Sequence, residues 1–192
     1  MLLRPPGERD VNRLAAIIAE PAVSRWWGEH DADWVRSELL ECEPGWVIVV
    51  DDAVAGWLQY TEESDPQYRH VGLDIFLTTA LHGRGVAREA IALAIRHFIE
   101  QGHHRFTIDP AAENQRAIRA YATLGFKPVG VMRRYERGPD GSWHDGLLMD
   151  LLADEFSQRS RGAPTGSAPN DQRHRRENHH SPSDERRGDR LR

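Results

Sequence analysis

The chain has 192 residues, of which 39% are hydrophobic and six are tryptophan, enough for one domain with a sizeable core. Its formal net charge is −5, and its only cysteine, Cys42, excludes an internal disulfide and a cysteine-based zinc cluster. No apolar run approaches the roughly 20 residues that a membrane span needs, and the N-terminus lacks the apolar core of a signal peptide. We therefore expect a cytoplasmic protein.

The spacing of apolar residues and of turn residues predicts alternating helices and strands. In chain order these are helices over 10–20 and 31–41, strands over 45–50, 53–61 and 71–77, a helix over 86–101, a strand over 105–109, a helix over 114–124, and strands over 128–136 and 144–152. This order predicts an α/β fold with a mixed, mostly antiparallel sheet. Its central strands, 71–77 and 105–109, are parallel because the helix over 86–101 joins them as a crossover.

The composition changes at Ser157. From there to the end the chain is rich in Ser, Pro, Gly and Arg, and Leu191 is the only large apolar residue. Such a segment cannot bury enough apolar surface to offset its ordering entropy. The sequence therefore predicts a folded domain over 1–156 and a disordered tail over 157–192.

The two parts differ in charge. The tail has nine arginines and five acidic residues, a net charge of +4, so the remaining 16 basic and 25 acidic residues give the domain a net charge of −9. An acidic domain argues against a nucleic-acid-binding face and favours a cationic substrate. The same charge can also serve solubility alone.

The stretch "HGRGVA", His82 to Ala87, places two glycines directly before a helix. A helix start offers unpaired N–H groups and the positive end of the helix dipole, and glycines let an anion approach the main chain. Arg84 can add a charge-assisted contact. The stretch is thus a candidate pyrophosphate site, and the alternative is a pair of glycines that only turn the chain into the helix.

Two other phosphate loops fit less well. A P-loop requires a lysine after its second glycine, and Lys127, the only lysine of the chain, lies far away in the sequence. A dinucleotide-binding loop requires a third glycine where Arg88 stands, and it belongs to a first strand–helix–strand unit.

A second motif, "ENQRAIRAYATLGF" over 113–126, decides between these alternatives. With it, the chain resembles the GNAT superfamily of acetyl-CoA-dependent N-acetyltransferases. The family loop is Gln/Arg-x-x-Gly-x-Gly/Ala, which residues 82–87 match except that His82 replaces the first residue. The family pattern Asn-x-x-Ala-Ile/Leu-x-x-Tyr-x-x-x-Gly-Phe matches residues 114–126 at every fixed position.

The resemblance implies a sheet that splays around the acetyl-CoA site, with helices on both faces. We expect no metal, because the pairs His103-His104 and His179-His180 would point to opposite faces of a strand and no further ligands cluster with them. Amides of a bulged strand around 75–77 would hold the acetyl carbonyl, and Asn114 would bond to the pantetheine arm or to an ordered water. Tyr121 would protonate the departing thiolate, unless it is simply a core aromatic residue; a phenol of pKa about 10 stays protonated at neutral pH. The implied cofactor-binding residues are Ile75, Phe76, Leu77, His82, Gly83, Arg84, Gly85, Val86, Ala87, Asn114, Ala117 and Tyr121.

Within the superfamily, "RWWGEH", "GLDIFL" and "SWHDGLLMDLL" are most similar to segments of aminoglycoside 6′-N-acetyltransferases, enzymes of the antibiotic-resistance type. This resemblance implies Asp74 as catalytic base and Asp109 as substrate anchor. A carboxylate of pKa near 4 is a poor base for an amine unless it acts through water or selects the amine's position. Trp26 and Trp27 can form a wall of the acceptor site, because flat rings pack against sugars and cations.

Three functions stay open on the sequence alone. The first is acetylation of the 6′-amine of an aminoglycoside, with acetyl-CoA and a cationic amine as partners, no membrane or nucleic-acid partner, and a monomer or a homodimer. The second keeps the chemistry but uses another acceptor: a hydroxylysine-type siderophore precursor, a protein N-terminus or a polyamine. The third is a binding protein whose arginine-rich tail contacts nucleic acid or a protein.

Overall fold

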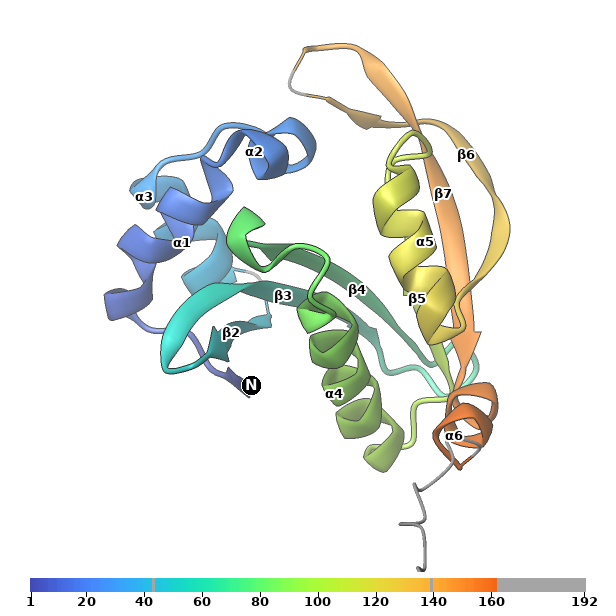
Figure 1. Ribbon diagram of the computed structural model, residues 1–192. Coiled ribbons are helices and arrows are strands. Elements are labelled where there is room, and N and C mark those ends of the chain that lie inside the picture. The colour runs from blue at the N-terminus through green and yellow to red at the C-terminus, as the bar shows by residue number, and fades with distance from the viewer. Residues whose placement is uncertain (43, 139, 162–192) are drawn as a thin grey trace, which may run out of the picture. The chain divides into compact units, whose positions relative to one another are not determined.

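A computed structural model describes residues 1–161 except 43 and 139, all within a unit that spans Met1–Gly162 (Figure 1). The second unit, Ala163–Arg192, lies outside the described residues. The strands are β1 (Leu2–Arg4), β2 (Gly45–Val50), β3 (Ala53–Glu63), β4 (His70–Leu77), β5 (Arg105–Ile108), β6 (Lys127–Arg137) and β7 (Trp143–Leu152). The helices are η1 (Glu8–Asp10), α1 (Val11–Ile18), α2 (Pro21–Trp27), α3 (Ala32–Trp34), η2 (Val35–Cys42), η3 (Thr79–Leu81), α4 (Val86–Glu100), α5 (Gln115–Leu124) and α6 (Ala153–Arg161).

The strands form one mixed sheet in the order β1-β2-β3-β4-β5-β7-β6. Every neighbouring pair is antiparallel except β4 and β5, which are parallel. The helix α4 connects these two strands, as a parallel pair requires. The predicted α/β fold, with its central parallel pair and its crossover helix, is confirmed.

Helices cover both faces of the sheet, because successive strand residues point to opposite sides. In β2, Val47 packs with α1 and α2 in one buried cluster, whereas Ile48 packs with α4 and α5 in another. In β4, Phe76 and Leu77 divide in the same way. In Figure 1, α1 to α3 lie on one side of the strands and α4 and α5 on the other.

The parallel pair separates soon after it forms. Only Val71 and Gly72 of β4 pair with β5, opposite Phe106 and Thr107, whereas β4 stays paired with β3 as far as Leu77. The expected splay is therefore present. The expected bulge at 75–77 is not, because the register of β4 against β3 is continuous from His70 to Leu77.

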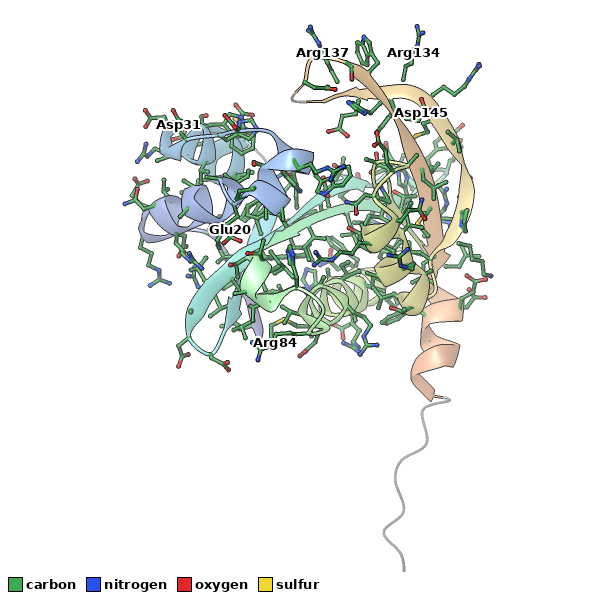
Figure 2. All side chains as sticks on the ribbon, turned by 45° about the horizontal axis from the view of Figure 1, so that its top comes forward. Glu20, Asp31, Arg84, Arg134, Arg137 and Asp145 are labelled. Atoms are coloured by element: carbon green, nitrogen blue, oxygen red, sulfur yellow. The ribbon has the colours of Figure 1, made fainter. Side chains whose placement is uncertain are left out.

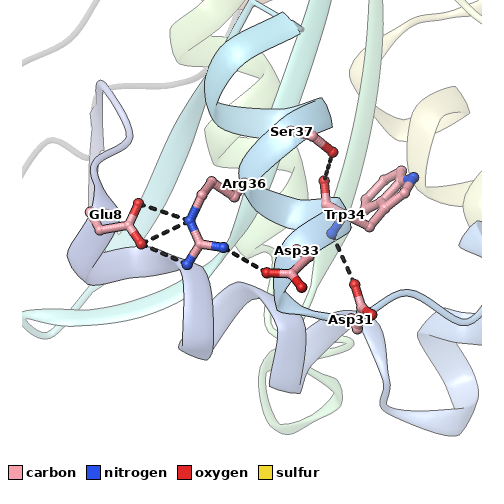
Figure 3. Close-up of polar contacts among 6 residues, drawn as sticks. All are labelled: Glu8, Asp31, Asp33, Trp34, Arg36 and Ser37. Carbon is pink, nitrogen blue, oxygen red and sulfur yellow. Dashed lines mark hydrogen bonds and ion pairs between the residues drawn. The ribbon is translucent and has the colours of Figure 1, made fainter.

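Ion pairs fix the N-terminal layer. The Asp10 side chain is only 2% exposed, and its two oxygens accept hydrogen bonds of 2.7 Å from Arg4, which lowers the pKa of Asp10. At the surface, Arg36 binds Glu8 at 2.7 Å and Asp33 at 2.8 Å (Figure 3). Exposed pairs of this kind contribute little stability. Removal of Arg4, in contrast, would leave the buried carboxylate of Asp10 without its partner, which is strongly destabilising.

Three elements differ from the sequence-based expectation. The segment around Trp26 and Trp27, for which no helix or strand was predicted, contains helix α2. This helix starts at Pro21, a residue preorganised for a first helical position, and is capped by Gly28 with φ 84°. Strand β1 was not predicted. Helix α6 crosses the predicted tail boundary and includes residues 157–161, and the rest of the predicted tail lies outside the described residues.

The C-terminal hairpin places β6 at the edge of the sheet, and Val129 and Val131 on it are exposed. Such an edge is a possible pairing surface, and a dimer remains a prediction. Within the described residues, no helix combines the length and the apolar character that crossing a membrane requires.

Candidate acetyl-transfer site

A cavity of about 830 Å³ opens where β4 and β5 separate. It is bounded by α2, the end of β4, the glycine loop with the start of α4, the segment after β5, and α5. The predicted site residues among its lining are Trp26, Trp27, Asp74, Ile75, Phe76, Leu77, His82, Gly83, Arg84, Gly85, Val86, Ala87, Asp109, Asn114, Ala117 and Tyr121. Every residue that the sequence proposed for the site therefore borders one cavity.

The glycine loop enters α4 through two left-handed residues. Gly83 has φ 75° and Gly85 has φ 82°, values that other residues adopt only with strain. As at any helix start, the first N–H groups from Val86 onward have no acceptor within the helix. A Cβ on Gly83 would meet no atom within 4 Å, so the loop is open toward the cavity. These features fit a diphosphate, and exposed Arg84 at the same loop adds positive charge (Figure 2).

His82 connects the glycine loop to β4. Its Nε2 lies 3.0 Å from the carbonyl oxygen of Leu77. Because a carbonyl can only accept, Nε2 carries the hydrogen. Burial, with the positive charge of Arg116, lowers the pKa of His82 and keeps the ring neutral. The residue that departs from the family loop thus anchors the loop to the strand.

The hydrogen-bonding pattern between β3 and β4 determines which amides of β4 face the cavity. The N–H of Thr78 donates to Ala55 of β3, so by alternation Phe76 also directs its N–H toward β3. Ile75 and Leu77 direct theirs toward the gap beside β5. The Ile75 amide donates to Oδ1 of Asp74 at 2.8 Å. Of the three predicted amides, Leu77 is therefore the one best placed to receive an acetyl oxygen.

Tyr121 lies on the α4 and α5 side of the sheet. It is 7% exposed and belongs to the larger buried cluster. Burial, followed by the negative charges of Asp74 and Asp109, raises its pKa well above the usual range. The phenol is therefore protonated at any working pH, as a general acid requires.

Asn114 caps α5, because its side chain accepts the N–H of Ala117 at 3.1 Å. This bond uses one of the two lone pairs of the carbonyl oxygen, so the oxygen can accept one further hydrogen bond and the amide nitrogen can donate to a pantetheine arm or a water. The predicted role of Asn114 stays a prediction.

Asp74 lies on the opposite side of the sheet from Tyr121. Even-numbered residues of β4 share the face of Phe76, which packs against α1 and α2. The Asp74 side chain is open to the cavity, yet protein atoms crowd it. This desolvation, with the charges of Asp109 and Glu136, raises the pKa of Asp74 to about 7. The gap between β4 and β5 therefore joins an acidic half of the cavity to the half that contains Tyr121.

The two tryptophans have different surroundings. Trp27 packs edge-to-face on Phe76, with ring centroids 4.9 Å apart. Trp26 is covered by the guanidinium of Arg25 at 4.7 Å and borders a second, adjoining cavity of about 410 Å³. Trp27 therefore packs partly against the core while it borders the larger cavity, and Trp26 forms part of the wall on the acidic side.

Acidic residues continue into the second cavity. Glu136 borders both cavities, and Glu113 and Asp140 border the smaller one. His144 links these last two residues at 2.9 and 3.0 Å, and hydrogen bonds to Asp140 and Glu113 raise its pKa. No alternation of polar and apolar residues marks the strand of Glu136, so nothing in the sequence singles out this residue. Across the described residues, no group of three or more His, Cys, Asp or Glu side chains has an arrangement that could hold a metal ion.

Comparisons with known proteins agree with this geometry. The acetyltransferase (GNAT) domain matches residues 1–127 of the sequence. No curated protein matches the chain in sequence. Similar solved structures include RimJ from Mycobacterium smegmatis in complex with CoA-disulfide (22% identity, TM-score 0.68, covering 83% of this chain and 88% of that one).

Two further structures show the same fold. The ribosomal-protein-alanine N-acetyltransferase from Brucella melitensis is 22% identical, with a TM-score of 0.63, covering 79% of this chain and 99% of that one. A spermidine N-acetyltransferase SpeG chimera from Vibrio cholerae and hSSAT is 20% identical, with a TM-score of 0.68, covering 82% and 98%.

A splayed parallel pair beside a glycine-opened helix defines a GNAT fold, the fold of acetyl-CoA-dependent N-acetyltransferases. The chain belongs to the GNAT acetyltransferase family.

Proposed function

We propose that this protein transfers an acetyl group from acetyl-CoA directly to a primary amine, and that the acceptor is the 6′-amine of an aminoglycoside. The observation that carries the proposal is one cavity lined by the open glycine loop, by Tyr121 and by the carboxylates Asp74, Asp109 and Glu136. An acidic wall of this kind attracts a polycation.

Acetyl-CoA supplies the activated acetyl group as a thioester. The main chain from Gly83 to Ala87 would hold its diphosphate, since the loop offers helix-start N–H groups next to open space. The N–H of Leu77 would orient the acetyl oxygen, because it faces the gap between the strands. Tyr121 would donate its proton to the departing sulfur.

The acidic half of the cavity would receive the acceptor. A substrate ammonium group must lose a proton before its nitrogen can attack, and a base works best with a pKa near the working pH. The raised pKa of Asp74, about 7, meets this requirement better than an ordinary carboxylate does. Asp109 and Glu136 would hold the cation in place, and the ring of Trp26 would border it.

The same carboxylates suit other amines, so the acceptor must be tested with a panel. Thiol release from acetyl-CoA should be measured with kanamycin, tobramycin, spermidine, N6-hydroxylysine and a peptide with an N-terminal alanine. Turnover of tobramycin or kanamycin well above the others supports the proposed acceptor. A preference for another amine keeps the acetyl transfer and rejects the aminoglycoside. Absence of thiol release with every amine, together with no heat of binding for acetyl-CoA in calorimetry, rejects the proposed function.

A further inference from the structure

The hairpin of β6 and β7 contains a wide irregularity beside the acceptor half of the cavity. Met132 pairs with Gly146, and Glu136 pairs with His144. Three residues of β6 therefore stand opposite one residue of β7, Asp145. Such bulges re-aim side chains and commonly lie next to functional sites.

A left-handed residue stands at the centre of this bulge. Arg134 has φ 52°, a conformation uncommon for residues other than glycine. Its N–H donates to Oδ1 of Asp145 at 2.7 Å. Figure 2 shows Arg134 and Asp145 on the two strands of the hairpin. The carboxylate thus stabilises a backbone turn that the sequence around Arg134 does not favour by itself.

The bulge places Tyr135 over β7 and beside Asp109. A Cβ on Gly146 would lie 2.9 Å from Cδ1 of Tyr135, so the ring covers this glycine closely. Interaction of its side chain with Asp109 raises the pKa of Tyr135 to about 12. The next residue, Glu136, borders both cavities.

The main chain at Asp145 also holds the segment that follows Asp109. The carbonyl oxygen of Asp145 accepts the N–H of Ala112 at 2.8 Å, and the N–H of Leu147 donates to the carbonyl oxygen of Pro110 at 2.9 Å. One short stretch of β7 is therefore hydrogen-bonded both to the segment that follows Asp109 and to the bulge that contains Tyr135. Asp145 itself borders neither cavity.

We infer that Asp145 is a positioning residue for the acceptor, resting on the proposed acetyl transfer: by holding the Arg134 bulge it sets Tyr135 against Asp109 and turns Glu136 toward the acceptor. Its negative charge is not what the site uses. An oxygen that accepts the Arg134 N–H is sufficient.

Substitutions separate this role from a direct charge contact. Asp145→Ala removes the acceptor oxygen, whereas Asp145→Asn keeps an oxygen and removes the charge. Arg134→Gly makes the left-handed conformation accessible without the hydrogen bond. With tobramycin, or with the panel amine of highest turnover, Asp145→Ala should raise the KM for the amine about tenfold, the order expected for one lost hydrogen bond. The KM for acetyl-CoA should stay within about twofold.

Two control variants should retain or recover affinity for the amine. Asp145→Asn should retain an amine KM near that of the unaltered protein, and Arg134→Gly added to Asp145→Ala should recover most of the loss. Loss of amine affinity in Asp145→Asn equal to that in Asp145→Ala, or no recovery with Arg134→Gly, would overturn the inference in favour of a direct charge contact.

A spectroscopic measurement makes the result independent of activity. With 3-fluorotyrosine incorporated, the fluorine resonance of Tyr135, assigned by its absence in Tyr135→Phe, should move in Asp145→Ala and stay in place in Asp145→Asn. An unmoved resonance in Asp145→Ala rejects the positioning role even if the enzyme is active. Failure of the unaltered protein to acetylate any amine rejects the proposed function. The fluorine resonance of Tyr135 still tests the positioning role of Asp145 in that case.

Discussion

The imidazole of His82 bonds through Nε2 to the carbonyl oxygen of Leu77 at 3.0 Å, joining the first residue of the glycine loop to the last residue of β4. The two ends of the proposed acetyl-CoA site are thereby fixed relative to each other. The loop would bind the diphosphate, and the Leu77 amide would face the acetyl group. The departure from the family pattern at this position thus has a structural explanation.

Removal of this bond should weaken acetyl-CoA binding. A typical hydrogen bond contributes about 1 kcal/mol, so His82→Ala should raise the dissociation constant for acetyl-CoA about fivefold in calorimetry. The dissociation constant of His82→Gln should lie between those of His82→Ala and the unaltered protein, because the glutamine amide can also donate to Leu77. Equal affinity of His82→Ala and the unaltered protein would show that the loop keeps its place without the bond.

Tyr121→Phe tests the leaving-group role. The ring stays in the buried cluster while the proton donor is lost, so kcat should fall about 100-fold, within the range for general acid catalysis. The dissociation constant for acetyl-CoA should change less than about twofold. Because the pKa of Tyr121 is raised, the unaltered enzyme should show no loss of activity from this group up to pH 9. An unchanged kcat in Tyr121→Phe would assign the residue to packing alone.

Asp74 should make the reaction pH-dependent. Below pH 7 its carboxyl carries a proton and can neither attract nor deprotonate an ammonium group, so kcat/KM for the amine should rise through about pH 7. Asp74→Asn should lower kcat about 100-fold and remove this rise. Asp109→Asn removes a charge that raises the pKa of Asp74, so the rise should move to lower pH. If kcat/KM for Asp74→Asn still rises through about pH 7, the rise comes from deprotonation of the substrate amine and not from Asp74.

The same pKa has a consequence for stability. In the folded protein the pKa of Asp74 is about 7, above its unfolded value of 3.8, so the charged form is disfavoured in the fold. The resulting cost develops as the pH rises from about 4 to about 7. Asp74→Asn should therefore have a higher melting temperature than the unaltered protein at pH 8 and a similar one at pH 4. A lower melting temperature at pH 8 would contradict the raised pKa.

Local patterns were sufficient for much of the site. Gly83 and Gly85 before a helix, and the motif from Asn114 to Phe126, are short-range features. Both glycines line the same cavity as Asn114, Ala117 and Tyr121 of the motif. The parallel strand pair also followed from the order of elements, because a helix between two adjacent strands makes a crossover. These inferences depend only on neighbours in the chain.

Other features depend on contacts between distant residues. The bulge at Arg134 is stabilised by Asp145 of the opposite strand, so the strand around Tyr135 and Glu136 has no local signal that turns them toward Asp109. The raised pKa of Asp74 likewise arises from groups on other elements. Neither the raised pKa of Asp74 nor the place of Glu136 in the site can therefore be predicted from the residues that flank them in the chain.

The link between α2 and the end of β4 was also beyond local reasoning. Glu20, labelled in Figure 2, is the residue before α2. It accepts three hydrogen bonds: from Oγ1 of Thr78 at 2.7 Å, and from N and Oγ1 of Thr79 at 2.6 Å each. Burial raises the pKa of Glu20, but these bonds outweigh it and leave the pKa below its usual value. The helix that carries Trp26 and Trp27 is thereby fixed to the strand that carries Asp74.

Glu20→Ala should destabilise the protein by about 1–3 kcal/mol at pH 7 in urea unfolding, because two threonines lose their acceptor. A lowered pKa in the fold means that the stabilisation is present above the unfolded value of 4.5 and is lost as the pH falls through the folded value. The difference between the two proteins should therefore shrink at pH 3. Thr79→Val, which removes one donor and keeps the shape, should show a smaller loss. A difference that stays constant between pH 7 and pH 3 would show that the charge of Glu20 does not contribute.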